Sequence, residues 1–368
     1  MADDRETTQH SFVSLNGLDH IEFYVGNAVQ AAYFYESSFG FTPTAYSGLE
    51  TGTTDRVSFV LSQHNIRLVL TSALTYRGAI ADHVHRHGDG VRDLAFEVES
   101  AEYAFQQAIK RGGLPILEPT TLEDSHGQVK KATIATCGDT VHTFIERQGY
   151  KGAFLPGFRS IPSARHFTRL GLTQVDHVAI AVEEGELDRW VQYYSEVLGF
   201  HSSHEEDVET GYTGMNSKVV EDGSGRIRFP IVAPAIRRHK SQINEFLSYY
   251  GSAGVQHIAL SSPDIAAAVR ALKGLGVRFL ATPSTYYESL RGRLGKIEED
   301  VKDLRDLNIL ADRDNWGYLM QIFTEPVEGR PTLFWEIIQR RGARGFGSGN
   351  IRALFEAVER AQALRGTL

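Results

Sequence analysis

Two stretches of the chain decide its fold: LDHIEFYVGNAVQAAYFYESSFGF at residues 18–41 and VDHVAIAVEEGELDRWVQYYSEVLGF at residues 175–200. Each begins with an Asp-His pair in an alternating apolar segment, which is typical of a strand. Each continues with apolar residues at helical spacing and stops at Gly-Phe, a helix-ending signal. Because similarity between distant parts of one chain indicates a duplicated structural unit, we predict two related halves.

The repetition extends beyond these stretches. GVRDLAF at residues 90–96 has a counterpart in GVQHIAL at residues 254–260, and each is an apolar strand entered from a glycine turn. Alternation predicts further strands and three- and four-residue spacing predicts helices, the strands at 57–61, 67–71 and 140–146 and the helices at 28–39, 101–111, 187–198, 242–250 and 265–275. Each half therefore repeats a β-α-β-β-β unit.

The repeats also suggest where the parts of the chain begin and end. We expect a first half at 15–150, a Gly- and Pro-containing linker at 151–170, a second half at 171–349 and a C-terminal helix at 350–366. This division makes the second half comparable, strand by strand, with the first.

The composition excludes several classes of protein. Hydrophobic residues make up 42% and charged residues 23% of the 368 residues, which is ordinary for a globular chain. The net charge is −8 and there is no long basic run, so nucleic acid is not an expected partner. A single cysteine, Cys137, excludes an intramolecular disulfide and fits a cytoplasmic protein. No signal peptide and no membrane contact are expected, because the N-terminus is polar and no apolar run reaches about 18 residues.

The second half carries polar residues that interrupt its apolar strands. His177 lies in its first strand, His257 in GVQHIAL, and Glu336 in the later apolar stretch at 334–338. Two imidazoles and one carboxylate are the ligand set of a facial-triad Fe(II) site, which leaves coordination positions open for a substrate and O₂. We therefore expect His177, His257 and Glu336 to bind the metal ion.

The first half offers a different set at the matching places. His20 and Asp93 correspond to the two histidines of the second half, and Glu146 in Phe144-Ile145-Glu146 resembles the counterpart of the glutamate. One imidazole and two carboxylates are a poorer match to such a site, and we expect no metal there. A polar stretch, predicted to be a loop, contains three more histidines for which no metal is expected: His83, His85 and His87.

Four βαβββ units in one chain resemble the vicinal oxygen chelate (glyoxalase-like) superfamily. The resemblance implies an α+β fold of two tandem open β-barrel halves around a divalent metal site. Longer motifs are similar to the 4-hydroxyphenylpyruvate dioxygenase family over nearly the whole chain: HGDGVRDLAFEV at 87–98, KSQINEFLSYYGSAGVQHIAL at 240–260, TPSTYY at 282–287, ILADRD at 309–314 and YLMQIFTEPVEGRPTLFWEIIQRRGARGFGSGN at 318–350.

This family resemblance implies a function. It places the iron ligands on His177, His257 and Glu336. It implies that Fe(II), O₂ and 4-hydroxyphenylpyruvate meet at the site, and that the keto acid is oxidatively decarboxylated without a separate 2-oxoglutarate. The helix at 350–366 corresponds to the family's lid, Gln256 and Gln321 have catalytic roles by resemblance, and the implied substrate pocket is lined by Ser217, Pro230, Val232, Gln242, Gln256, Gln321, Phe323, Phe334, Phe346, Asn350, Ile351 and Leu354.

The family divides by product. Homogentisate-forming members typically have Asn where this chain has Val232 and Phe where it has Ile351, whereas hydroxymandelate-forming members resemble it at both places. Pro230 and the segment 325–330 are instead similar to the homogentisate branch. We expect a 4-hydroxymandelate synthase activity, with homogentisate formation as the alternative and a dioxygenase for another aryl or alkyl 2-oxo acid as a more distant one.

Other functional classes remain open at this point. A glyoxalase-type isomerase, an extradiol ring-cleaving enzyme and a ligand-sequestering binding protein all occur on the resembled fold. The triad argues against a binding protein, since binding alone needs no redox metal with open positions. We also expect a homo-oligomer.

Overall fold

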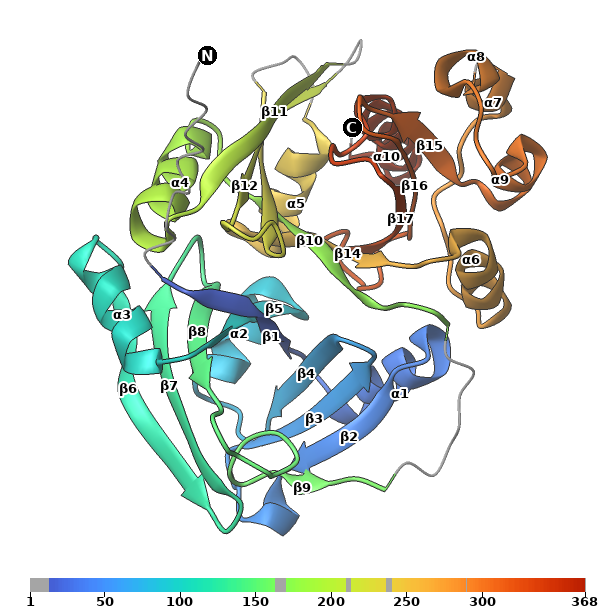
Figure 1. Ribbon diagram of the computed structural model, residues 1–368. Coiled ribbons are helices and arrows are strands. Elements are labelled where there is room, and N and C mark those ends of the chain that lie inside the picture. The colour runs from blue at the N-terminus through green and yellow to red at the C-terminus, as the bar shows by residue number, and fades with distance from the viewer. Residues whose placement is uncertain (1–12, 163–169, 210–212, 236–239, 289, 368) are drawn as a thin grey trace, which may run out of the picture.

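Two strongly curved sheets, flanked by helices, form the molecule (Figure 1). The computed structural model describes residues 13–162, 170–209, 213–235, 240–288 and 290–367. The first sheet has 9 strands in the order β6-β7-β8-β5-β1-β4-β3-β2-β9, and the second has 8 in the order β11-β12-β13-β10-β14-β17-β16-β15. This confirms the expected α+β fold of two tandem open β-barrel halves.

The elements follow the chain in two series. The first comprises β1 (Leu15–Tyr24), α1 (Ala28–Phe39), β2 (Thr42–Ser47), a 3₁₀ turn (Leu49–Thr51), β3 (Arg56–Gln63), β4 (Ile66–Ala73), α2 (Ala79–His87), β5 (Gly90–Val98), α3 (Ala101–Lys110), β6 (Pro115–Asp124), β7 (Gly127–Ala135), β8 (Val141–Glu146) and β9 (Arg159–Ser160). The second comprises β10 (Gln174–Ala181), α4 (Leu187–Tyr193), a π-helical turn (Tyr194–Leu198), β11 (His201–Glu209), β12 (Gly214–Glu221), β13 (Arg228–Pro234), α5 (Gln242–Tyr250), β14 (Gly254–Ser261), α6 (Ile265–Gly274), α7 (Ser284–Glu288), α8 (Leu290–Leu294), α9 (Val301–Leu307), β15 (Leu310–Arg313), β16 (Tyr318–Phe323), β17 (Phe334–Arg341) and α10 (Ser348–Arg365).

Local sequence explains the first helix of the repeat. Asn27 caps α1, because its side-chain oxygen accepts from the backbone N–H groups of the second and third helical residues, each at 3.1 Å. Tyr35 and Phe39 lie one turn apart on the buried face. Gly40 ends the helix with a φ of 68°, a left-handed conformation that glycine adopts without strain.

The polar stretch that contains His83, His85 and His87 is helix α2, and the prediction of a loop there is wrong. Ile80, His83 and His87 are its buried residues and recur at helical spacing. Since two of these three residues are histidines, the buried face has little apolar character in the sequence. That is why periodicity of apolar residues did not reveal the helix.

Part of the predicted linker belongs to the first barrel. Strand β9 pairs with β2 through Arg159 and Ser160, and the buried ring of Phe154 packs edge-on against His20 with the ring centres 5.0 Å apart. Residues 163–169 of the predicted linker lie outside the described residues.

Aromatic packing joins the two halves. The indole of Trp335, on β17 of the second half, is fully buried. Its ring centre lies 6.1 Å from Phe23 and 5.6 Å from both Tyr35 and Phe39 of the first half. Such aromatic clusters gain both from area burial and from edge-to-face geometry, so the two halves share one continuous core.

A second contact between the halves involves the end of α2. The Arg330 guanidinium donates to the backbone carbonyls of His85 at 3.2 Å and Arg86 at 2.5 Å, and to that of Tyr249 on α5 at 3.2 Å. The last carbonyls of a helix lack partners inside the helix and carry partial negative charge. One cation therefore satisfies carbonyls from both halves.

Arg330→Ala is expected to lower the free energy of unfolding by about 1–2 kcal/mol, because the carbonyls at the α2 terminus lose a charged donor. Urea unfolding measures the change. Arg278→Ala is the matched control, since that side chain is 79% exposed and pairs with Glu325 at the surface, and it should cost at most about 0.5 kcal/mol. Equal losses in the two variants would contradict the proposed contribution of the Arg330 contact.

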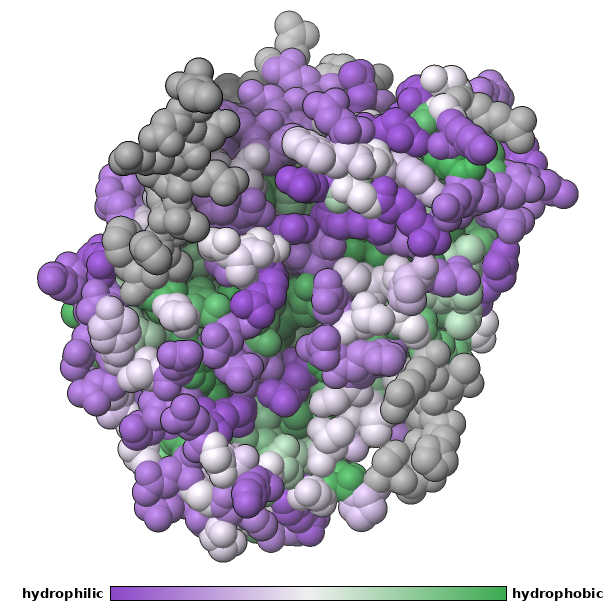
Figure 2. Space-filling view, in the orientation of Figure 1, coloured by the Kyte–Doolittle hydropathy of each residue, from purple (hydrophilic) through white to green (hydrophobic). Residues whose placement is uncertain are grey.

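The surface is mostly hydrophilic on the face drawn in Figure 2, and apolar side chains show mainly in its hollows. Among the described residues, no helix combines the length and the apolar character that a membrane crossing requires.

Candidate metal centre and active site

Strand register brings three distant residues to one place in the second barrel. On the antiparallel pair β10 and β14, His177 lies opposite Ala259. On the parallel pair β14 and β17, Ala259 lies opposite Glu336. His257 precedes Ala259 by two residues and so faces the same side of the sheet, because side chains alternate along a strand. The three side chains therefore converge inside the barrel.

The convergence has the geometry of a metal site. Oε2 of Glu336 lies 3.2 Å from Nε2 of His177 and 3.6 Å from Nε2 of His257. The candidate ligand atoms of all three residues lie within 4.8 Å of one another. The carboxylate side chain is only 1% exposed. A buried carboxylate facing two imidazole nitrogens needs a shared cation between them, and a divalent metal ion is suited to that place.

The outer sides of both imidazoles have acceptors. Nδ1 of His177 is 2.8 Å from Oδ1 of Asp176, and Nδ1 of His257 is 3.2 Å from Oε1 of Gln256. A proton on Nδ1 of each ring would satisfy these acceptors and leave the lone pair of Nε2 for a metal ion, as metal-binding histidines require. Burial would lower the pKa of His177, but the carboxylates of Glu336 and Asp176 outweigh it and raise the pKa to about 8. Burial, with His177 nearby, holds the pKa of His257 well below its usual value.

An amide network fixes the carboxylate. Nε2 of Gln321 donates to Oε1 of Glu336 at 2.8 Å and to the backbone carbonyl of Phe346 at 3.2 Å. Oε1 of Gln321 accepts from Nδ2 of Asn350 at 2.8 Å. Gly347 adjoins this network with a φ of +76°, and a Cβ there would lie 2.9 Å from the Gln321 oxygen, so only glycine fits. The network leaves Oε2 of Glu336 directed at the two histidines.

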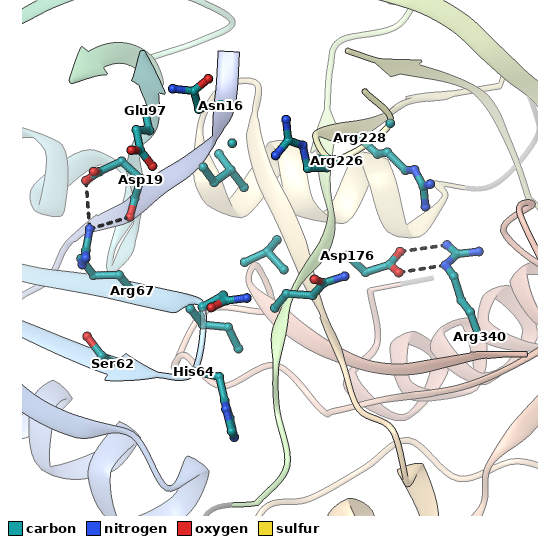
Figure 3. Close-up of a pocket in the computed structure, with 17 residues that line it drawn as sticks. Asn16, Asp19, Ser62, His64, Arg67, Glu97, Asp176, Arg226, Arg228 and Arg340 are labelled. Carbon is teal, nitrogen blue, oxygen red and sulfur yellow. Dashed lines mark hydrogen bonds and ion pairs between the residues drawn. The ribbon is translucent and has the colours of Figure 1, made fainter. Parts of the chain in front are cut away.

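Asp176 is itself held in place by Arg340. The guanidinium donates twice to the carboxylate, each time at 2.8 Å (Figure 3). Burial would raise the pKa of Asp176, but Arg340 and His177 outweigh it and keep the pKa far below its usual range. Arg340 also donates to the carbonyl of Gly345 at 2.5 Å, one residue before Phe346. One side chain thus connects a candidate metal ligand to the turn that leads into α10.

A larger cavity, of about 630 Å³, lies between the halves and is drawn in Figure 3. Two of its charged pairs, Arg67 with Asp19 and Arg340 with Asp176, are ion pairs within the protein. The cavity beside the triad is smaller, about 50 Å³. We assign the candidate active site to the smaller cavity, because it holds the three convergent candidate metal ligands.

Most of the pocket residues expected from the sequence line the cavity beside the triad: Ser217, Pro230, Val232, Gln242, Gln256, Gln321, Phe323, Phe346, Ile351 and Leu354. Four lining residues were missed: His204, Glu206, Met215 and Val219. The strand periodicity around Ser217 could have found two of them, since Met215 and Val219 lie two residues to either side.

Two expected pocket residues lie behind the cavity wall. Phe334 stacks on the ring of His257 with centres 4.8 Å apart. Asn350 is fully buried. Its side-chain amide donates to Oε1 of Gln321 and accepts from the hydroxyl of Tyr286, 2.6 Å away. Both therefore support residues that face the cavity.

The first barrel shows what stands in place of the triad. His20 lies opposite Ala95, as His177 lies opposite Ala259. The register of β5 and β8 places Thr143 level with Ala95. Thr143 donates its backbone N–H to Oδ1 of Asp93 at 3.0 Å, and its hydroxyl contacts Oδ2. Burial raises the pKa of Asp93 to about 6.

The counterpart of Glu336 is therefore Thr143, and the assignment of that place to Glu146 is wrong. Oε2 of Glu146 accepts from the backbone N–H of Ala101 at 3.1 Å, and Oε1 pairs with Lys130 at 3.1 Å. Glu146 thus caps helix α3 outside the barrel. The error was a three-residue shift, which the similar sequences Phe-Ile-Glu at 144–146 and Phe-Trp-Glu at 334–336 concealed.

A second cluster of possible metal ligands comprises His83, His87 and Asp139. Nδ1 of His87 is 2.6 Å from the carbonyl of Tyr250 and Nε2 is 2.8 Å from Asp139. Both ring nitrogens of His87 therefore already face acceptors within the protein. The Arg86 guanidinium also donates to the same Asp139 oxygen at 2.6 Å. The carboxylate is already paired with the Arg86 guanidinium, and the cluster serves the contact between the halves.

Comparison with known proteins gives the chain a family. The family model described as the Glyoxalase/Bleomycin resistance protein/Dioxygenase superfamily matches residues 17–150 and 174–322. The 4-hydroxyphenylpyruvate dioxygenase of Dictyostelium discoideum is 46% identical, over 96% of this chain and 100% of its own length. That of Yarrowia lipolytica is 44% identical, over 98% of this chain and 95% of its own length.

Solved structures of known proteins are also similar to this chain. A triple mutant of 4-hydroxymandelate synthase from Streptomyces coelicolor has a TM-score of 0.86 and 38% identity, over 95% of this chain and 99% of that chain. The Mn(II)-bound glyoxalase from Novosphingobium aromaticivorans shares the fold alone, with a TM-score of 0.50 and 11% identity over 89% of this chain and 83% of that chain. With two glyoxalase-type halves, a convergent His-His-Glu group and full-length relatives, the chain belongs to the 4-hydroxyphenylpyruvate dioxygenase family.

Proposed function

We propose that this protein is an Fe(II)-dependent dioxygenase that oxidatively decarboxylates 4-hydroxyphenylpyruvate with O₂ and releases CO₂ and 4-hydroxymandelate. The observation that carries the proposal is the triad of His177, His257 and Glu336, in which both imidazoles and the carboxylate have their outer atoms satisfied and their inner atoms free to bind one ion. Fe(II) bound there would supply open positions for the 2-oxo acid and O₂ and the redox chemistry of the reaction.

The protein itself positions the reacting groups and excludes water from them. Gln321 and Asn350 orient the carboxylate of Glu336 and tie it to α10. Helix α10 supplies Ile351 and Leu354 to the cavity wall. As a lid over the cavity it would exclude water from the reacting atoms.

The choice of product follows from the position of the aromatic ring. Val232 is 4% exposed on the cavity wall and offers no hydrogen bond. Ile351 occupies less volume than an aromatic side chain would. A displacement of about 1 Å can change a positioned reaction by about 10²-fold. An aliphatic wall that lets the ring move favours attack at the benzylic carbon. Homogentisate, from attack on the ring, is the second candidate product.

The test is product identification. Purified protein is loaded anaerobically with Fe(II) and given 4-hydroxyphenylpyruvate and O₂, and the products are separated by chromatography against both standards, because the two products are isomers. 4-Hydroxymandelate supports the proposal. Homogentisate would leave the dioxygenase assignment intact and overturn the product assignment. If the protein turned over only other aryl or alkyl 2-oxo acids, these would replace 4-hydroxyphenylpyruvate as the proposed substrate.

Val232→Asn combined with Ile351→Phe is expected to raise the homogentisate share of the product by about tenfold or more, because the ring gains an amide partner at residue 232 and loses space at residue 351. Product ratios at equal total turnover measure the effect. The single variants are the controls, and each should shift the ratio less than the pair, since both residues bound one cavity. An unchanged product ratio in the double variant would mean that residues other than 232 and 351 determine the product.

A further inference from the structure

Two polar side chains that the sequence did not reveal share rows with the expected substrate pocket. Across β11, β12 and β13, Glu206 lies opposite Ser217, which lies opposite Val232. Residues that lie opposite one another in neighbouring strands point to the same face of the sheet. All three line the cavity beside the triad. The carboxylate of Glu206 therefore faces the cavity.

The next row adds a histidine. His204 lies opposite Val219, which lies opposite Pro230, and these three also line the cavity. Nε2 of His204 is 3.4 Å from Oε2 of Glu206. This is the one side-chain partner that the described part of the chain gives the carboxylate, and the contact is long for a charge-assisted hydrogen bond.

The surroundings make an unsatisfied carboxylate costly. The Glu206 side chain is 11% exposed, and the wall around it is formed by Met215, Val219 and Val232 from the neighbouring strands. Removing a carboxylate from water into such surroundings is unfavourable unless donors replace the lost water. A ligand that brings a donor to this place would gain from it.

Glu206 lies at the end of the cavity away from the candidate metal ligands. Val232 pairs with Ala181, which is four residues along β10 from His177, about 13 Å at roughly 3.3 Å per residue. The ring of Phe346 lies between, with its centre 5.0 Å from that of His177 and 6.2 Å from that of His204. A ligand chelated at the triad would therefore direct its far end toward Glu206.

We propose that Glu206 determines substrate specificity by accepting a hydrogen bond from a hydroxyl group at the far end of the substrate's aromatic ring, with His204 orienting the carboxylate. The proposal rests on the proposed function and deepens it, because it selects arylpyruvates with a donor in the para position over arylpyruvates without one. An unsubstituted ring would cover the carboxylate and leave it with the long His204 contact alone. Sites built to bind a hydroxyl group discriminate strongly against analogues that lack it.

The test compares 4-hydroxyphenylpyruvate with phenylpyruvate. For the wild-type protein, Glu206→Leu and Glu206→Gln, kcat/KM is measured for both keto acids, and their dissociation constants are measured anaerobically with the Fe(II)-loaded proteins. Glu206→Leu is expected to reduce the preference for the hydroxylated substrate by about tenfold or more, since one hydrogen bond to a charged group is lost. Glu206→Gln, whose amide oxygen still accepts, should retain part of the preference.

Glu205→Leu is the matched control. Glu205 is the next residue of the same strand, points to the opposite face, is 62% exposed and pairs with Lys218 at 3.3 Å. It should leave the preference unchanged. Turnover of both keto acids with the wild-type ratio in Glu206→Leu would overturn this inference alone. Failure of the wild-type protein to bind either keto acid would overturn the proposed function and the inference with it.

Discussion

Glu336→Gln is expected to weaken Fe(II) binding by on the order of 10²–10⁴-fold, taking about 3–5 kcal/mol for the loss of one charge from a buried, mutually compensating group. Turnover of 4-hydroxyphenylpyruvate should fall at least as much. The amide keeps the shape of the carboxylate and can still accept the hydrogen bond that Gln321 donates at 2.8 Å. What it lacks is the negative charge that faces both imidazole nitrogens at 3.2 and 3.6 Å.

The measurement is an anaerobic Fe(II) titration against a competing chelator, followed by an activity assay at saturating Fe(II). Glu146→Gln is the matched control, because it makes the same chemical change in the first half, where the side chain caps α3 and pairs with Lys130. It should leave Fe(II) affinity unchanged. Wild-type Fe(II) affinity in Glu336→Gln, with the protein folded, would remove the carboxylate from the ligand set.

The register explains how far the sequence could predict this site. His177 and His257 were predicted because each interrupts an apolar strand within a repeated motif, and repeated motifs carry their own register. Glu146 was misplaced because β8 and β17 each contain two apolar residues followed by a glutamate, at 144–146 and 334–336, in different registers. Three residues of shift also reverse the face of a strand, so Glu146 points out of the barrel where Thr143 points in.

Glu206 and His204 could not be predicted for a different reason. Their strand, His201–Glu209, has a sequence of almost entirely polar residues, with a single buried residue, Val208. Alternation of apolar residues therefore gives no indication of which side faces the cavity. Only the pairing of Glu206 with Ser217 assigns the face, and that pairing is a property of the folded sheet.

The two halves retain the same apparatus for orienting a histidine. In the first, Asp19 lies 2.6 Å from Nδ1 of His20 and accepts twice from Arg147, at 2.6 and 2.7 Å. In the second, Asp176 stands in the same relation to a candidate metal ligand and to Arg340. Burial would raise the pKa of Asp19, but Arg147 and His20 outweigh it and keep the pKa far below its usual range. The Asp-His-Arg arrangement is thus common to both halves, whereas the convergent His-His-Glu group lies in the second half.

Because the Asp-His-Arg arrangement occurs in both halves, matched variants of the two copies can separate its effect on stability from its effect on Fe(II) binding. Arg340→Gln is expected to weaken Fe(II) binding by about 10–100-fold, as is typical when a group that orients a ligating histidine is removed. Arg147→Gln makes the same change around His20 and should leave Fe(II) affinity unchanged, although both variants lose a buried ion pair and should unfold at lower urea concentration.

The experiment measures both quantities in both variants, with Arg340→Lys as a conservative third. A lysine restores the charge beside Asp176 but not the two parallel hydrogen bonds, so it should recover part of the affinity. Equal losses of Fe(II) affinity in Arg340→Gln and Arg147→Gln would mean that global stability and not histidine orientation governs the site. A loss confined to Arg340→Gln would show that an arrangement present in both halves acts on the metal in only one, because only there do a second histidine and a glutamate stand opposite the oriented ring.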